Sequence, residues 1–178
     1  GPSQSINLPA AATLAGTATD DGLPNPPASL TTTWSLVSGP GPGVVFTDAH
    51  ATGTTATFLA AGTYVLRLTA DDGAMSRSST VQIMVNDGAP LFAPIADRTI
   101  LLGTRFQLAL QARESNVGDT LTYSLPTAPA GATLNPSPVI DWLPTLAQLG
   151  PNTFTARVID GAGNAATATF HVTVVRDN

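Results

Sequence analysis

The 178-residue chain has no cysteine and no lysine, and glutamate supplies only one of its twelve acidic residues. Without cysteine the chain has no disulfide framework, no thiolate zinc site and no cysteine nucleophile. Lysine and glutamate are typical of helix surfaces, whereas aspartate and glycine favour turns, so this composition argues against helices. The 16 glycines and 15 prolines, together with abundant threonine and valine, predict an all-β fold.

Charge is also scarce, because only 11% of the residues are charged and the formal net charge is −5. A hydrophobic share of 43% is enough to bury a core, so the chain is expected to fold. The acidic balance makes nucleic acid and anionic membranes poor partners and leaves divalent cations to be considered. No run approaches the roughly 18 apolar residues of a membrane span, so no membrane insertion is expected.

The two halves of the chain repeat one another. The segment GTYVLRLTADDG at 62–73 resembles NTFTARVIDGAG at 152–163, at an offset of 90 residues. Further matches lie at an offset of 89: Trp34-Ser35-Leu36 with Tyr123-Ser124-Leu125, and Val81, Ile83 and Val85 with Phe170, Val172 and Val174. This offset is the length of a small β-sandwich, so the sequence predicts two tandem modules, residues 3–87 and 88–178. Gly1-Pro2 is typical of what tag removal leaves and is set outside the first module.

Within each module apolar residues alternate with polar ones, which indicates half-buried strands. The residues predicted to face a core are Tyr64, Leu66, Leu68, Phe106, Leu108, Leu110, Phe170, Val172 and Val174. Turn signals separate the strands: DDGLPNPP at 20–27, SGPGPG at 38–43, DDG at 71–73, SNVGD at 115–119 and DGAG at 160–163. Each module is therefore expected to be an immunoglobulin-like antiparallel β-sandwich of six or seven strands, with a short linker between the two.

Specific motifs in the first module are similar to a known family. WSLVSGPG at 34–41 and GTYVLRLTADDG at 62–73 are the most distinctive. Residues 5–87 resemble a PKD-type domain, a β-sandwich common in bacterial surface proteins and secreted enzymes.

The second module resembles the dystroglycan-type cadherin-like domain, which is also described as an Ig domain. The likeness rests on four segments: DTLTYSL at 119–125, APAGATL at 128–134, IDWLPTLAQLG at 140–150 and FTARVIDGAGNAATATFHVTV at 154–174. Such domains occur in arrays in surface and adhesive proteins and as appendages of secreted enzymes, and they are not known as catalysts.

Together the two resemblances imply a function. We expect a non-catalytic extracellular structural or adhesion module, a semi-rigid spacer in a larger bacterial surface or secreted protein. Its expected partners are neighbouring repeats of the same polypeptide, and another cell-surface protein or a glycan. The alternative is a carbohydrate-binding accessory module of a secreted polysaccharide-degrading enzyme.

The segment VNDGAPLF at 85–92 is similar to the linker of cadherins, which supplies ligands for calcium. Carried over by position, the resemblance implies a calcium site at the domain junction with these ligands: Asn86, Asp87, Glu114, Asn116 and Asp160. The LDRE-type acidic motif of cadherins is missing, because residues 140–144 are IDWLP. The alternative is that Asp71, Asp72, Asp119 and Asp160 cap β-turns without a metal.

Other residue types capable of chemistry lack the partners that catalysis needs. His50 lies in a turn segment and His171 on the outward phase of a strand, so both are expected at the surface. Asp71 and Asp72 are adjacent on a turn and cannot flank a sugar as a glycosidase pair does. Trp34, Tyr123 and Trp142 are expected in the core, and the alternative is that they form exposed aromatic platforms for a ligand.

Overall fold

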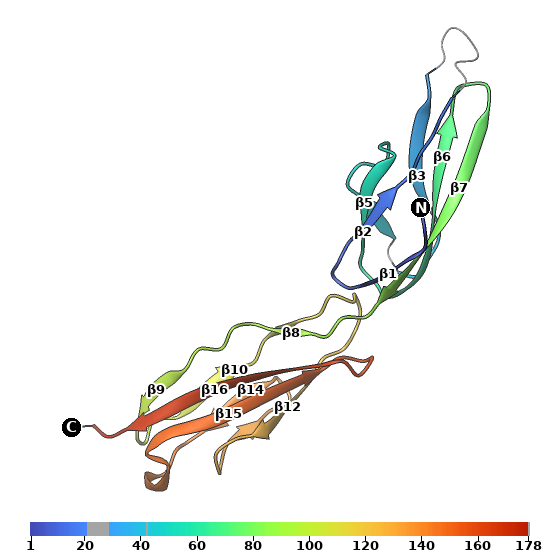
Figure 1. Ribbon diagram of the computed structural model, residues 1–178. Coiled ribbons are helices and arrows are strands. Elements are labelled where there is room, and N and C mark those ends of the chain that lie inside the picture. Colours follow the sequence, from blue (N-terminus) through green and yellow to red (C-terminus); the bar gives the residue numbers. More distant parts are fainter. Residues whose placement is uncertain (21–28, 42, 178) are drawn as a thin grey trace. The chain divides into compact units, whose positions relative to one another are not determined.

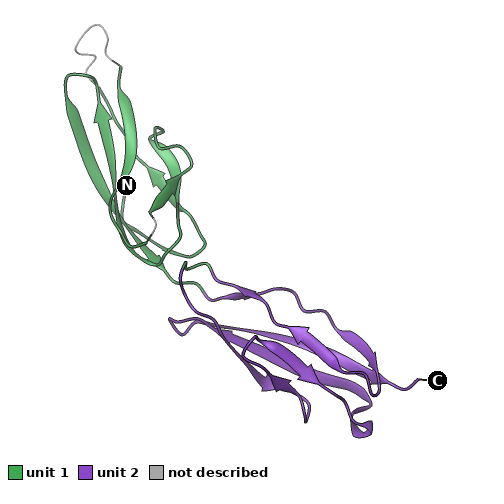
Figure 2. Ribbon diagram, turned by 180° about the vertical axis from the view of Figure 1, so that it is seen from behind, with its two compact units in different colours: residues 1–88, 115–117 green, residues 89–114, 118–178 purple. Residues whose placement is uncertain are grey.

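The computed structural model describes residues 1–20, 29–41 and 43–177. The chain divides into two compact units: unit 1 comprises Gly1–Gly88 with Ser115–Val117, and unit 2 comprises Ala89–Glu114 with Gly118–Asn178 (Figure 2). The turn predicted at 20–27 lies outside the described residues except for residue 20, and so does residue 42 of the SGPGPG turn.

Unit 1 consists of strands packed as two sheets (Figure 1). Its strands are β1 (Gln4–Asn7), β2 (Ala12–Ala15), β3 (Thr31–Ser38), β4 (Val44–Phe46), β5 (Gly53–Phe58), β6 (Gly62–Asp71) and β7 (Ser76–Asn86). One sheet has the order β1-β7-β6-β3 and the other the order β2-β5-β4.

Unit 2 has the same arrangement with two short strands added. Its strands are β8 (Leu91–Phe92), β9 (Arg98–Leu101), β10 (Phe106–Ala109), β11 (Ala112–Arg113), β12 (Thr122–Thr127), β13 (Thr133–Leu134), β14 (Val139–Trp142), β15 (Gly150–Ile159) and β16 (Ala165–Val175). One sheet has the order β9-β16-β15-β12, the other β10-β14-β13, and β8 pairs with β11. A single 3-10 turn, η1 (Leu146–Gln148), is the helical element of the described chain. The predicted all-β class and tandem sandwich architecture are therefore confirmed.

The two units share the same sheet orders, as the sequence repeat predicts. The repeated segments form equivalent hairpins, β6–β7 in unit 1 and β15–β16 in unit 2. In one respect the pairing differs from the antiparallel prediction, because β1 runs parallel to β7 and β9 runs parallel to β16. After β1 and after β9 the chain enters the other sheet of its unit, at β2 and at β10.

The predicted inward residues build the two cores. Tyr64, Leu66 and Leu68 are buried in unit 1, where they pack with Trp34. In unit 2 the buried residues include Phe106, Leu110, Phe170, Val172 and Val174, with Leu108 and Tyr123 half-buried against them. Trp142 has no exposed surface. The predicted strand phase is thus confirmed in both units.

Four aromatic rings form the centre of the core of unit 2. The ring of Phe154 lies 5.2 Å from that of Phe170, 5.4 Å from Trp142 and 5.7 Å from Phe106, between centroids. Phe154 is fully buried on β15, the strand between β12 and β16. Aromatic pairs at these separations add stability beyond the area they bury. Phe154 is accordingly the residue whose loss should weaken unit 2 most directly.

We expect Phe154→Ala to lower the free energy of unfolding of unit 2 by about 3–5 kcal/mol, because it leaves a cavity among three rings. Chemical denaturation followed by tryptophan fluorescence measures this loss, since Trp142 contacts the altered site. Leu146→Ala is the matched control, because that side chain is 60% exposed and should change stability little. Equal destabilisation by both variants would contradict the central role assigned to Phe154 in the core of unit 2.

Candidate functional site

Asn86 is the last residue of strand β7, and its side chain forms hydrogen bonds with strand β1. Its side-chain Nδ2 donates to Ser5 Oγ at 3.0 Å and to Asn7 Oδ1 at 2.9 Å. The backbone carbonyl of Asn86 accepts from Leu8 N at 3.0 Å. Within unit 1, Asn86 therefore helps to hold β1 in register along β7.

Asp87 and Asn116, two of the predicted ligands, meet in unit 1. Asn116 Nδ2 donates to Asp87 Oδ2 at 3.2 Å, and Asn116 Oδ1 accepts from Ala61 N at 3.2 Å. The neighbouring Val117 N donates to Leu59 O at 2.8 Å. The amide oxygen of Asn116, the atom that could bind a cation, is thus engaged with the backbone of the β5–β6 loop.

Asp160 caps the hairpin turn between β15 and β16. Its carboxylate accepts from Asn164 N at 2.8 Å and from Asn164 Nδ2 at 2.9 Å. The residue is only 6% exposed, and it is the buried acidic residue of the described chain. Turn capping by Asp160, one of the two predicted roles, is therefore present in the structure.

Asp119 lies beside Asp160 in unit 2. Asp119 Oδ1 accepts from Thr120 N at 2.7 Å and from Gly161 N at 2.9 Å. A carboxylate oxygen of Asp119 lies within 4.8 Å of one of Asp160. A side chain at residue 161 would collide with the Asp119 carboxylate, which explains the glycine there. Glu114, which follows β11, is half-buried and is not part of this pair.

Sequence reasoning assigned Asp119 to turn capping alone and missed its proximity to Asp160. A signal for it exists in strand pairing, because Thr122 on β12 lies opposite Ile159 on β15. The residues just before β12 and just after β15 must therefore meet. The register between two strands 37 positions apart is set by packing, so the local pattern could not supply it.

The carboxylate oxygens of Asp119 and Asp160 are the kind of ligand atom that calcium prefers. Calcium prefers oxygen ligands and takes six to eight of them, usually with several carboxylates. Two carboxylates are a partial set that backbone carbonyls and water can complete. The same oxygens accept backbone N–H groups, so the metal and the turn-capping roles draw on the same atoms.

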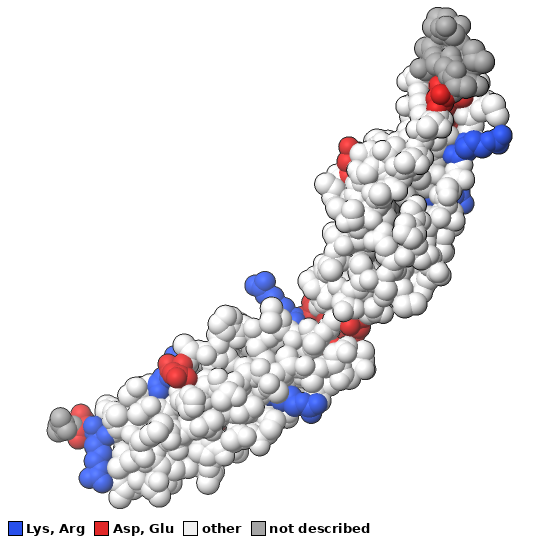
Figure 3. Space-filling model, in the orientation of Figure 1, with Lys and Arg blue, Asp and Glu red and all other residues white. Residues whose placement is uncertain are grey.

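Aspartates elsewhere also serve turns. In the β6–β7 turn, Gly73 N donates to Asp71 Oδ1 at 2.8 Å, and Met75 N and Ala74 N donate to Asp72 Oδ1 at 2.6 and 2.8 Å. The N–H groups of Met75 and Ala74 hold the pKa of Asp72 below its usual range. Charged side chains are few on the face drawn in Figure 3. His50 and His171 are exposed, as the sequence predicted.

One ion pair stands out on the β10–β14 pair of unit 2. Arg105 Nε donates to Asp141 Oδ1 at 2.7 Å, and Gln107 Nε2 donates to Asp141 Oδ2 at 2.9 Å. These two hydrogen bonds, that of Arg105 first, hold the pKa of the Asp141 carboxyl below its usual range. The same contact raises the pKa of Arg105.

All ten aromatic side chains are buried or half-buried, and all lie within the described residues. The two tryptophans keep their ring nitrogens inside as well: Trp34 Nε1 donates to Thr52 O at 3.2 Å, and Trp142 Nε1 to Ala130 O at 3.3 Å. The alternative predicted from the sequence, sugar stacking on exposed aromatic rings, would need an exposed ring, and none of the ten rings is exposed.

Within the described part of the chain, no helix is long and apolar enough to cross a membrane.

Comparison with known proteins gives a family for each half. Residues 1–85 match the family model of a PKD domain, and residues 89–175 match the family described as "Putative Ig domain". Three solved structures are similar over part or all of the chain.

An endo-fucoidan hydrolase of glycoside hydrolase family 107 is 17% identical over 99% of this chain, with a TM-score of 0.45. The match spans 28% of that hydrolase. Human protocadherin-24 EC1-2 is 15% identical over 84% of this chain and 83% of its own, with a TM-score of 0.45. The PKD domain of the KIAA 1837 protein is 31% identical over 48% of this chain and 81% of its own, with a TM-score of 0.39.

We expect Arg105→Gln to raise the pKa of Asp141 toward the ordinary value of about 3.9, because the strongest donor to its carboxylate is lost. In the native protein, the stability that ionised Asp141 contributes is fully present above that ordinary value. It is lost as the pH falls through the lowered pKa of the folded state. A carboxyl NMR titration measures the change.

Arg98→Gln is the control for this titration, since it removes an exposed arginine of the same unit that has no ion pair with a described carboxylate. It should leave the pKa of Asp141 in place. A pKa that stays low in Arg105→Gln would mean that Gln107 alone lowers it.

Proposed function

The chain consists of a PKD domain, residues 1–85, followed by an Ig-type domain, residues 89–175, and from this premise we propose that it is a non-catalytic extracellular structural or adhesion module. In this proposal the two domains act as a semi-rigid spacer within a larger surface or secreted protein. Neighbouring repeats of the same polypeptide are its partners, together with another cell-surface protein or a glycan.

The parallel pairing of an early strand with the last strand of each unit is the observation that carries the proposal. In unit 1 the first strand, β1, runs parallel to β7, and in unit 2 β9, which follows the short β8, runs parallel to β16. The last strand of each sandwich therefore runs in the same direction as this early strand. A domain of this kind suits head-to-tail arrays, because the next domain continues the path rather than folding back.

The short connection between the domains supports limited bending. Only residues 87–90 separate the end of β7 from the start of β8. Gly88 lies so close to the carbonyl oxygen of Leu8 that a side chain there would collide, so the start of the connection is packed onto unit 1. Pro90 then fixes its own φ and restricts the residue before it.

The use made of polar side chains supports a non-catalytic role. The aspartates Asp71, Asp72 and Asp160 cap turns, and Asp141 is held by Arg105 and Gln107. These groups hold local geometry, whereas catalysis needs a nucleophile, an acid or a base within reach of a shared substrate.

We further propose that calcium binds unit 2 through Asp119 and Asp160. The proximity of the two carboxylates supports it, and the ion would offset the repulsion between them. The assignment of Asn86, Asp87, Glu114 and Asn116 as additional ligands stays a prediction of the sequence.

We expect millimolar calcium to raise the melting temperature of unit 2 relative to excess chelator. An ion present at 100 times its dissociation constant stabilises the folded state by about 2.7 kcal/mol. Asp119→Asn and Asp160→Asn should each reduce the calcium-induced rise, whereas Asp71→Asn, which alters a turn cap in unit 1, should not. Differential scanning calorimetry with and without calcium makes the comparison within each variant. An identical melting temperature in both buffers would refute calcium binding.

X-ray scattering in solution tests the semi-rigid spacer proposal. A connection that limits bending should give a pair-distance distribution with a distinct interdomain maximum. Inserting eight glycine and serine residues after Gly88 should blur the interdomain maximum of the pair-distance distribution. A native distribution as broad as that of the insertion variant would contradict a semi-rigid spacer.

A further inference from the structure

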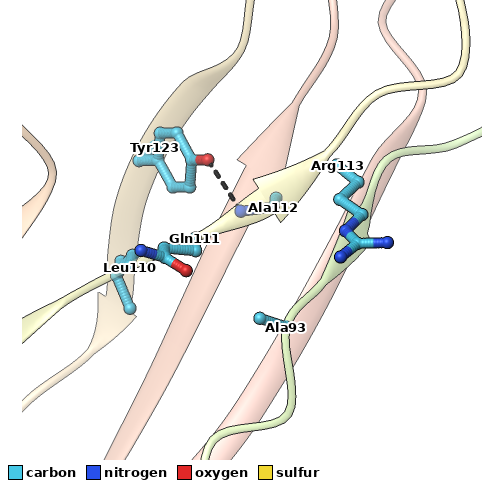
Figure 4. Close-up of a pocket in the computed structure, with 6 residues that line it drawn as sticks. All are labelled: Ala93, Leu110, Gln111, Ala112, Arg113 and Tyr123. Atoms are coloured by element: carbon cyan, nitrogen blue, oxygen red, sulfur yellow. Dashed lines mark hydrogen bonds between the residues drawn. The ribbon is translucent and has the colours of Figure 1, made fainter.

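A pocket of about 350 Å³ opens within unit 2 beside the short β8–β11 pair (Figure 4). It is lined by Ala93, Leu110, Gln111, Ala112, Arg113 and Tyr123. In Figure 4, Tyr123 and Arg113 lie on opposite sides of this group, with Ala112 between them and Gln111 beside Leu110. Its volume is at the lower end of the range for small-molecule sites and suits a ligand of about one sugar residue.

The pocket exists because the chain changes partner after β10. Leu110 N still donates to Pro138 O at 2.9 Å, on the β14 side of the unit. The next residue, Gln111, offers its carbonyl to Ala93 N at 2.8 Å, and β11 then pairs with β8. The switch separates the β8–β11 pair from the β10-β14-β13 sheet and leaves an opening against Tyr123 on β12.

The polar groups of the pocket are mainly hydrogen-bond donors. The Tyr123 hydroxyl accepts from Ala112 N at 3.1 Å, so its own proton is left to donate to a ligand. The Tyr123 ring is fixed by its edge contact with Phe92, at 6.2 Å between centroids. Gln111 adds an exposed amide that both donates and accepts.

Arg113 gives the pocket its charge. Its side chain is exposed, and among the described residues no salt bridge joins it to a carboxylate. None of the lining residues, all of them described, is acidic. The pocket therefore favours an anion and lacks a group for the ammonium of an amino acid or another cation.

We propose that this pocket binds a carboxylate-bearing sugar, a uronic acid residue of an acidic glycan. The guanidinium of Arg113 would hold the carboxylate through two parallel hydrogen bonds. Gln111 and the Tyr123 hydroxyl would bond the ring hydroxyls, and Ala93, which is exposed, would contact the apolar C–H face. The inference does not depend on the spacer role, because every lining residue belongs to unit 2.

The test is an NMR titration of the whole chain with sodium glucuronate, and with glucose as the neutral counterpart. Glucuronate should shift the Ala112 amide, the Gln111 side-chain amide and the Arg113 Nε–H, all saturating with one dissociation constant. Glucose should bind at least tenfold more weakly, because a hydrogen bond to a charged group is lost. Equal binding of the two sugars, or shifts spread over the chain with no focus on these groups, would overturn the proposal.

Two variants and a matched control locate the site. Arg113→Gln should weaken glucuronate binding about tenfold or more, and Tyr123→Phe should weaken it less, since the ring remains. Arg98→Gln removes the same charge from another exposed site of unit 2 and should leave the affinity unchanged. Melting temperatures of all three identify any loss of fold. Equal weakening by Arg98→Gln and Arg113→Gln would show that net charge, rather than the pocket, attracts the sugar.

Discussion

The parallel pairing of β1 with β7 and of β9 with β16 is the constraint on which both units depend. In unit 1 it fixes β1 beside β7, and the Leu8 N to Asn86 O hydrogen bond of 3.0 Å ends the pair. In unit 2 the bond from Leu102 N to Val175 O, at 2.8 Å, does the same for β9 and β16. The pairing gives hydrogen-bond partners to the C-terminal end of the longest strand of each unit, residues 83–86 of β7 and 172–175 of β16, and so covers part of an edge that would otherwise stay open.

The few charges of the chain act mostly on local geometry. Carboxylates accept backbone N–H groups in turns, as at Asp72 and Asp160, or lie in a three-residue cluster around Asp141. Two places in unit 2 hold charges that could bind a ligand. Asp119 and Asp160 bring two carboxylates together, and Arg113 places a cation at a pocket that has no acidic lining residue. A cation proposal and an anion proposal thus arise in one unit from opposite local imbalances of charge.

Folding of the two sandwiches and any binding by them draw on different residues. The aromatic rings are committed to the cores, with Phe154 at the centre of one and Tyr64 fully buried in the other. In the proposed binding of a sugar, recognition would therefore use hydroxyl, amide and guanidinium groups at the margins of the sheets rather than stacking. Tyr123 shows both roles at once, since its half-buried ring packs on the core while its hydroxyl faces the pocket.

The sequence by itself determined the all-β class, the repeat, the strand phase and the turn roles of Asp71 and Asp72, because each is a local or periodic property of the chain. Alternation of period two assigns Tyr64, Leu66 and Leu68 to one face without knowledge of any partner strand. Only the tertiary structure decided the parallel pairing of β1 with β7, the proximity of Asp119 to Asp160 and the pocket beside Arg113. Each of these joins residues distant in sequence, and their contact depends on strand order and register, which packing of the whole core selects.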